Sequence, residues 1–139
     1  MKIVVNKCYG GFGLSHKAIM RYAELSGFTL YPFAGMRDKR GALIIDQFIP
    51  CIPDDYNMFY VGYSKQPLTA DGKYVNGSYF SARDIERDDK ILVQVVEELG
   101  ADADGNYAEL EIVEIPDNIE WVIDEYDGIE TVEEKHRSW

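Results

Sequence analysis

Residues 3–27 read IVVNKCYGGFGLSHKAIMRYAELSG, which combines a short apolar run, a glycine cluster and a segment with helical spacing. The apolar run at residues 3–5 predicts a strand, and residues 18–25 predict a helix that ends at Gly27. A glycine-rich turn that leads into a helix brings together backbone N–H groups that lack partners within the helix. This arrangement suits a bound phosphate or carboxylate, but it does not identify the ligand.

The glycine loop at residues 7–16 supplies the first group of candidate ligand-binding residues. Its glycines allow positive φ angles and close approach of a ligand, while an ammonium, a hydroxyl and aromatic rings would meet the phosphate and the base of a nucleotide. These candidates are Lys7, Tyr9, Gly10, Gly11, Phe12, Gly13, Ser15 and His16. The loop matches neither the dinucleotide-binding fingerprint nor the P-loop, so a tight strand-to-helix turn that merely needs glycines is an equally good interpretation.

The charged run at residues 83–89 supplies the second group of candidates. Arg83 and Arg87 could grip a phosphate or a carboxylate in a bidentate manner. Acidic residues lie beside both arginines in this run, so a solvated charge network with Asp84 and Asp88 is the favoured alternative.

No catalytic residue, metal site or cofactor is expected. Cys8 and His16 flank the same turn and could form a thiolate pair, but no other signature of a cysteine hydrolase accompanies them. A hairpin near the C-terminus is rich in carboxylates but lacks EF-hand spacing, so a solvated acidic face is favoured over bound Mg²⁺ or Ca²⁺. Its carboxylates belong to Asp124, Glu125, Glu130, Glu133 and Glu134.

The composition predicts one folded domain that spans residues 1–139. Apolar residues make up 46% of the chain and aromatic residues 13%, which is enough for a hydrophobic core. No apolar run approaches the ~18 residues that a membrane-spanning helix needs, and the N-terminal residues lack a signal-peptide pattern. We therefore expect a cytoplasmic protein that does not contact a membrane.

The formal net charge of −11 is unevenly distributed along the chain. Residues 1–45 contain seven Lys or Arg and two Asp or Glu, whereas residues 91–139 contain two and fifteen. The acidic part disfavours direct binding of nucleic acid, and the basic part suits an anionic small molecule. The same asymmetry is compatible with homo-oligomers, and a row of carboxylates could instead mimic a nucleic-acid backbone.

The order of the remaining patterns predicts an α+β fold, a mostly antiparallel sheet with two main helices packed on one face. A second helix is expected to begin at Asp88 or Asp89 and to end at Gly100. Residues 76–77 and 127–128 are typical of hairpin turns. Further strands are predicted at residues 28–31, 42–45, 58–63, 74–75, 79–80, 107–115 and 120–126.

Four segments have a less regular pattern. Pro32 is expected to end the preceding strand, and residues 35–41 are typical of a basic exposed loop. Residues 48–53 contain two prolines and predict an irregular or edge segment. Residues 129–139 fit either a strand that returns along the hairpin or a short terminal helix.

Residues 6–15 (NKCYGGFGLS) resemble a group of small uncharacterised proteins from tailed bacteriophages and prophages. The likeness continues in residues 83–89, 95–100, 125–128 and 134–137, whereas residues 36–66 fit it poorly. The resemblance implies a viral accessory protein in the cytoplasm of a bacterial host, and it brings no established activity or catalytic residues. Small phage proteins of this kind often counter host defence, which is an association rather than a physical argument.

Two hypotheses follow for the function. The first is a non-catalytic phage protein that counters host defence by sequestering a nucleotide-derived anionic signal in the glycine loop, with Arg83 or Arg87 as further phosphate ligands. The alternative is an acidic inhibitor that mimics nucleic acid and occupies a basic groove of a host nuclease or CRISPR-type effector. The expected partners are thus a nucleotide-like small molecule and a host defence protein.

Overall fold

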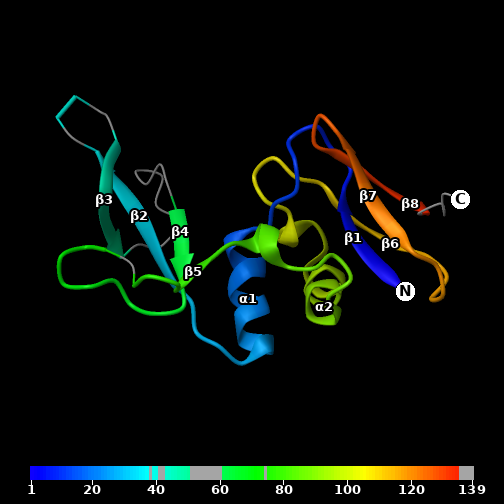
Figure 1. Ribbon diagram of the computed structural model, residues 1–139, viewed down its shortest axis with the longest axis horizontal. Helices are drawn as coiled ribbons and strands as arrows, with labels where there is room; N and C mark the ends of the chain where they lie inside the picture. Colours follow the sequence, from blue (N-terminus) through cyan, green and yellow to red (C-terminus); the bar gives the residue numbers. More distant parts are fainter. Residues whose placement is uncertain (38, 41–42, 51–60, 74, 135–139) are drawn as a thin grey trace, which may run out of the picture. The chain divides into compact units, whose positions relative to one another are not determined.

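The computed structural model of the protein describes residues 1–37, 39–40, 43–50, 61–73 and 75–134. Its described residues form two α-helices and eight β-strands in antiparallel sheets, so the α+β prediction is confirmed. Two compact units make up the chain (Figure 1): unit 1 comprises Met1–Ser26 and Ala82–Trp139, and unit 2 comprises Gly27–Ser81. That residues 1–139 form a single domain stays a prediction.

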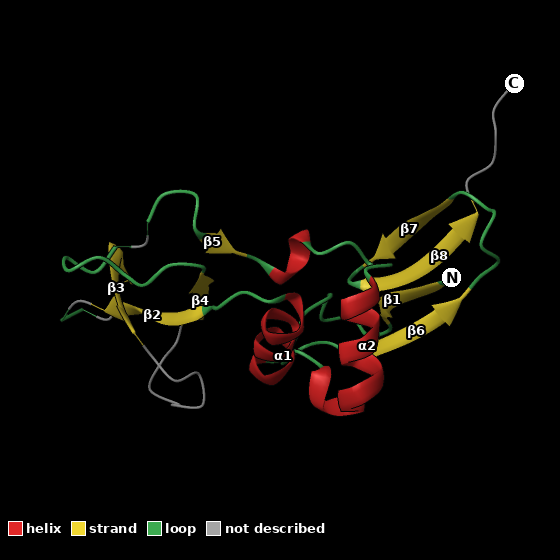
Figure 2. Cartoon of the chain, turned by 90° about the horizontal axis from the view of Figure 1, so that it is seen from below, coloured by secondary structure: helices red, strands yellow, loops and turns green. Residues whose placement is uncertain are grey.

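The strands of unit 1 form two antiparallel pairs. They are β1 (Lys2–Asn6), β6 (Leu110–Glu114), β7 (Trp121–Tyr126) and β8 (Ile129–Glu134). β1 pairs with β6, and β7 pairs with β8 as a hairpin. β1 also contacts β8, so the two pairs lie side by side, as Figure 2 shows.

The helices of unit 1 are α1 (His16–Ser26) and α2 (Lys90–Leu99), and short 3-10 turns occupy Ala82–Asp84 and Gly100–Ala103. α2 packs on β1 and β6, and α1 packs on α2 (Figure 2). This packing arises because α2 has an apolar face and β1 is apolar on both sides. The fully buried core includes Ile3, Val4, Val5, Leu92 and Val95.

Helix α2 begins and ends at the residues that the sequence predicts. The Asp89 carboxylate accepts hydrogen bonds from the backbone N–H groups of Ile91 at 2.8 Å and Leu92 at 3.1 Å. Gly100 caps the other end with a positive φ of 57°. Asp89 also accepts a hydrogen bond from the Tyr22 hydroxyl at 3.0 Å, and burial together with this bond raises the pKa of Tyr22. One carboxylate therefore joins the two helices.

Unit 2 is a four-stranded antiparallel sheet in the order β3-β2-β4-β5. Its strands are β2 (Tyr31–Arg37), β3 (Leu43–Pro50), β4 (Val61–Ser64) and β5 (Tyr79–Phe80). Phe33 is 1% exposed and forms the centre of this unit, with its ring centroid 4.8 Å from that of Phe48. Gly62 pairs with Phe33 across the strands. A side chain at position 62 would clash with the Phe33 ring, because a Cβ there would approach the ring to 2.6 Å.

Two expectations for unit 2 were wrong. Pro32 lies inside strand β2 rather than ending a strand at residues 28–31, and residues 35–37 continue that strand rather than forming a loop. Pro32 pairs with Tyr63 of β4, and the pairing of β2 with β3 among the described residues begins at Phe33.

Other expectations for the sheet are met in part. The turn at residues 76–77 forms, since Ser78 N–H donates to the Val75 carbonyl at 3.0 Å, but β5 pairs with β4. Residues 48–50 belong to β3, which is an edge strand. Residues 129–134 form a return strand. The predictions for residues 51–53, 58–60, 74 and 135–139 lie outside the described residues.

Replacing Asp89 with Ala is expected to lower the free energy of unfolding by about 1–2 kcal/mol, because two N–H groups at the start of α2 lose their acceptor. Urea denaturation followed by circular dichroism would measure this loss. Asp88→Ala is the matched control, since Asp88 is an exposed carboxylate one residue earlier, and it should change stability by less than about 0.5 kcal/mol. Equal losses in the two variants would contradict the capping role.

Candidate functional site

The glycine loop packs closely against two other segments of unit 1. A Cβ at Gly10 would lie 1.8 Å from the Tyr107 carbonyl oxygen, and a Cβ at Gly128 would lie 2.5 Å from the Gly11 nitrogen. Neither position can hold a side chain unless the backbone moves. Glycine at these positions therefore allows three backbone segments to approach one another closely. This agrees with the interpretation of the loop as a tight turn.

Two N–H donors at the start of α1, those of Ser15 and Ala18, are occupied by the protein itself. Ser15 N–H donates to the Ala103 carbonyl at 2.9 Å, and the Ser15 hydroxyl donates to the Asp102 carbonyl at 2.6 Å. The same hydroxyl accepts the N–H of Ala18 at 3.1 Å. The side chain of Ser15 is thus an N-cap, and these amides are not available to an anion in this structure.

The remaining loop candidates differ in exposure. Lys7 is half-buried and its N–H donates to the Glu109 carbonyl at 2.8 Å, while the side chain of Tyr9 is 73% exposed. Phe12 is buried, and His16 is half-buried at the first residue of α1. Gly13 accepts a hydrogen bond from Gly105 at 3.0 Å. The loop therefore does not gather its predicted ligand groups into one anion site.

Arg87 forms an ion pair inside unit 1 rather than with its neighbours in sequence. Its Nη1 and Nη2 atoms lie 2.6 Å and 2.9 Å from the two carboxylate oxygens of Glu130. The side chains of Arg87 and Glu130 are only 17% and 5% exposed. The Phe12 ring covers the guanidinium, with its centroid 3.5 Å from Cζ. Arg87 is thus paired in a bidentate manner, shielded from water and committed to Glu130.

The same pair completes the free edge of strand β1. Val4 N–H donates to the Arg87 carbonyl at 2.9 Å, and Asn6 N–H donates to Glu130 Oε1 at 2.8 Å. Both donors belong to fully buried residues. Because buried N–H groups need acceptors, Arg87 and Glu130 here take the place of a neighbouring strand.

Cys8 is placed as a hydrogen-bond donor. Its Sγ lies 3.0 Å from the Tyr107 carbonyl oxygen and 3.4 Å from Asn6 Oδ1. Both neighbours are acceptors, and neither can take a proton from the thiol as a general base does. Within the described part of the chain, no group of three or more His, Cys, Asp or Glu side chains could hold a metal ion.

A hollow of ≈ 280 Å³ lies between residues 83–87 and strand β7. Trp121 and Ile123 of β7 line it and are half-buried, and Arg83 at its rim is exposed. The lining thus includes Trp121 and Arg83 together with the carboxylate residues Asp84 and Glu86. The two arginines were predicted from the sequence as ligand-binding residues and Trp121 was not, although alternation along residues 121–126 places positions 121 and 123 on one side of the strand.

The net charge of the chain resides in unit 1. Unit 1 contains nine Lys or Arg and twenty Asp or Glu, whereas unit 2 contains five of each. Around the helices, carboxylates pair with basic side chains: Lys2 with Glu97, Lys17 with Asp102, and Arg21 with both Glu24 and Glu98. The hydrogen bond to Glu98 raises the pKa of Arg21. Four carboxylates near the helices are therefore compensated.

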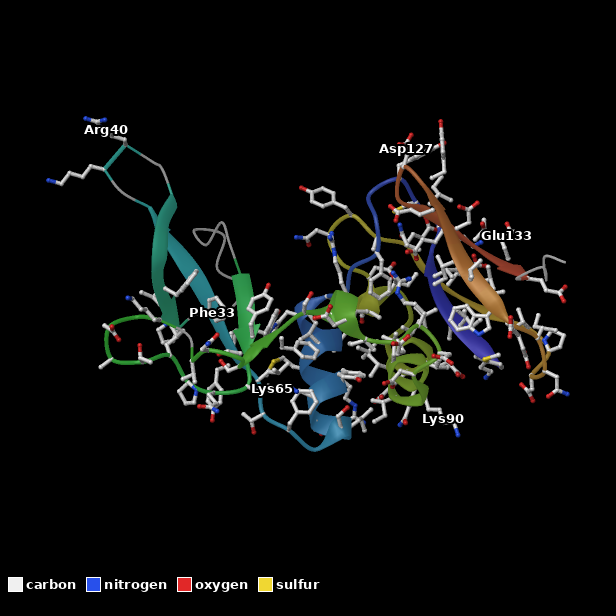
Figure 3. All side chains as sticks on the ribbon, viewed as in Figure 1. Phe33, Arg40, Lys65, Lys90, Asp127 and Glu133 are labelled. Atoms are coloured by element: carbon white, nitrogen blue, oxygen red, sulfur yellow. The ribbon has the colours of Figure 1, made fainter. Side chains whose placement is uncertain are left out.

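The strand side of unit 1 is not compensated. Its exposed carboxylates, called the acidic surface below, belong to Glu109, Glu111, Glu114, Asp124, Glu125, Asp127, Glu133 and Glu134. None of them forms an ion pair with another described residue. Figure 3 shows Asp127 at the tip of the β7–β8 hairpin and Glu133 on β8. Glu130 is buried, so the expectation that it joins the exposed acidic face was wrong.

Replacing Glu130 with Gln is expected to lower the free energy of unfolding by about 3 kcal/mol, because it leaves the largely buried Arg87 guanidinium without a counter-charge. Chemical denaturation would measure the loss. Glu133→Gln removes the same charge from an exposed position of the same strand and should cost less than about 0.5 kcal/mol. A similar stability of the two variants would show that the pair does not hold the edge of β1.

Comparison of the chain with protein-family models, with curated proteins and with solved structures found no match. Within the described residues, no helix is both long enough and apolar enough to cross a membrane. Two features of unit 1 bear on its function, namely the uncompensated acidic surface and the hollow beside Trp121.

Proposed function

We propose that the protein binds a basic surface of another protein through the acidic surface of unit 1. The observation that carries this proposal is the contrast between the two sides of the unit. Glu24, Glu97, Glu98 and Asp102 near the helices are paired with Lys or Arg, whereas the carboxylates of the acidic surface have no counter-ion among the described residues. An uncompensated field of one sign attracts partners of the opposite sign and speeds their association.

The strands hold these charges at fixed spacings. Asp124 pairs with Thr131 and Val122 pairs with Glu133, so Asp124 and Glu133 are diagonal neighbours on one face of the hairpin. Diagonal neighbours of this kind lie about 7–8 Å apart. Glu125 and Glu134 lie on the other face of the same hairpin. Negative charges held on strands in this way resemble the phosphates of a nucleic-acid backbone, so we propose that the partner is a protein whose groove binds nucleic acid.

The resemblance to proteins of tailed bacteriophages narrows this proposal to a host defence protein, such as a nuclease or a CRISPR-type effector. Sequestration of an anionic signal by the glycine loop is less well supported. The amides of Ser15 and Ala18 are occupied by oxygen atoms of the protein, and Arg87 is paired with Glu130.

A second candidate function is binding of a small nucleotide-like anion in the hollow beside Trp121. In this second proposal Trp121 stacks on a base, and Arg83, which also lines the hollow, holds a phosphate or carboxylate group. This second candidate keeps Arg83 as a phosphate ligand, as predicted from the sequence, but it places the site beside strand β7 rather than in the glycine loop.

The main proposal is tested with a fluorescent nona-lysine peptide as the basic probe. Neutralising three carboxylates of the hairpin should weaken binding about tenfold, and wild-type binding should fall steeply as the salt concentration rises from about 0.05 M to about 0.5 M. The hairpin variant is Glu125→Gln, Glu133→Gln and Glu134→Gln. The matched control removes three charges that are already paired: Glu97→Gln, Glu98→Gln and Asp102→Asn.

The matched control should bind the peptide within about twofold of the wild type, because its carboxylates are already neutralised by neighbouring cations. Fluorescence polarisation would measure both variants. Equal weakening in the two variants would show that only the net charge matters, and absence of binding to the wild type would remove the proposal. Competition between the protein and a DNA oligonucleotide for a basic nuclease would then test the mimicry.

The second candidate is tested by the fluorescence of Trp121 in a Trp139→Phe background, which leaves one indole in the chain. ADP-ribose or a cyclic dinucleotide should quench this fluorescence with saturation, and Arg83→Gln should weaken the binding about tenfold. Lys73→Gln, a change in unit 2, is the control and should leave the binding unchanged. Quenching that is linear in the ligand concentration would count against the hollow as a site.

A further inference from the structure

Three tyrosines are far more exposed than the other large apolar side chains among the described residues. Tyr9 is 73% exposed, Tyr107 is 78% exposed and Tyr126 is 76% exposed, whereas the next value is 47% for Tyr79. Transfer of an aromatic side chain out of water lowers the free energy. Three exposed aromatic side chains in one region are therefore unfavourable unless a partner covers them. We call these three residues the tyrosine platform.

The three tyrosines belong to distant parts of the sequence that meet at one end of unit 1. Gly10, next to Tyr9, would place a Cβ only 2.4 Å from the Cβ of Tyr107. Gly128 would place a Cβ 2.5 Å from the Tyr9 carbonyl oxygen, and Tyr126 precedes the same hairpin turn. The close approach of the glycines therefore carries the tyrosines into one region.

Asn6 fixes this arrangement of the backbone. Its side-chain amide nitrogen donates to the carbonyls of Cys8 and Gly128, each at 2.7 Å, and its oxygen accepts the N–H of Glu109 at 2.8 Å. Asn6 is fully buried, so these bonds are protected from water. One side chain thus ties together the three segments that carry the tyrosines. A platform on such a fixed backbone loses little conformational entropy when a partner binds.

Carboxylates of the acidic surface border the platform. Glu109 lies two residues after Tyr107, and Asp127 follows Tyr126, both of them exposed, whereas Glu125 lies on the opposite face of the hairpin from Tyr126. An aromatic ring beside a carboxylate favours arginine over lysine, because the guanidinium stacks on the ring while it pairs with the carboxylate. Tyrosines are also frequent among the residues that dominate the energy of protein interfaces.

We propose that the tyrosine platform docks an arginine-rich segment of the partner protein. This inference rests on the proposed binding of a basic protein surface. It adds where on unit 1 the partner docks and which basic side chain is selected there. The acidic surface attracts any basic partner, and the platform selects arginine within it. Charge alone would not distinguish arginine from lysine, so this selectivity separates the platform from the acidic surface in an experiment.

The test compares nona-arginine and nona-lysine peptides as probes of the wild-type protein and of a variant with Tyr9→Ser, Tyr107→Ser and Tyr126→Ser. The wild type should bind nona-arginine about tenfold more tightly than nona-lysine. The triple variant should lose this preference and change its affinity for nona-lysine by less than about twofold. Tyr31→Ser, in unit 2, is the control and should keep the preference.

Circular dichroism would establish that the triple variant is folded, and the single variant Tyr107→Ser replaces it if it is not. Loss of the preference in either variant supports the platform. An unchanged preference for nona-arginine in the folded variant would overturn the platform but leave the acidic surface as the binding region. Absence of binding of both peptides to the wild type would overturn the proposed function and the platform together.

Discussion

The bidentate contact between Arg87 and Glu130 holds one end of unit 1 together. Strand β1 has a paired neighbour only on its β6 side, and on the other side the buried N–H groups of Val4 and Asn6 need acceptors. The Arg87 carbonyl and the Glu130 carboxylate supply them. A buried pair of charges is costly to desolvate and would be weak support for stability by itself. Here the carboxylate also completes a backbone edge, which a pair of apolar side chains could not do.

The contact between Arg87 and Glu130 also explains why the loop contains glycines. The Phe12 ring covers the guanidinium, so the loop must pass directly over Arg87, and the β7–β8 turn must approach the loop to bring Glu130 beneath it. Side chains at Gly10 or Gly128 would block that approach. The glycines, the charged run and the acidic hairpin are thus parts of one packing arrangement. A loop that must pack on its own protein in this way has few donors left for an anion.

Local signals in the sequence were sufficient for much of the fold. An aspartate and a glycine define α2, and Asp127-Gly128 defines a hairpin turn with positive φ angles of 49° and 91°. Pairing over long distances was not predictable: nearer carboxylates at Asp84 and Asp88 were available to Arg87, yet it pairs with Glu130, 43 residues away. Only the packed structure decides between such partners, because Arg87 is largely buried and must pair with the carboxylate that the fold holds beside it, which is Glu130.

The distribution of paired charges also limits what unit 1 can bind. Ion pairs neutralise four carboxylates near the helices, whereas the exposed carboxylates of the acidic surface form no ion pair with another described residue. Exposed surface pairs add little stability, so the main effect of this distribution is on the field around the molecule. Charge of this kind speeds encounter but selects poorly among basic partners. Selectivity then requires contacts of defined geometry within the field, and we propose that the exposed side chains of Tyr9, Tyr107 and Tyr126 make them.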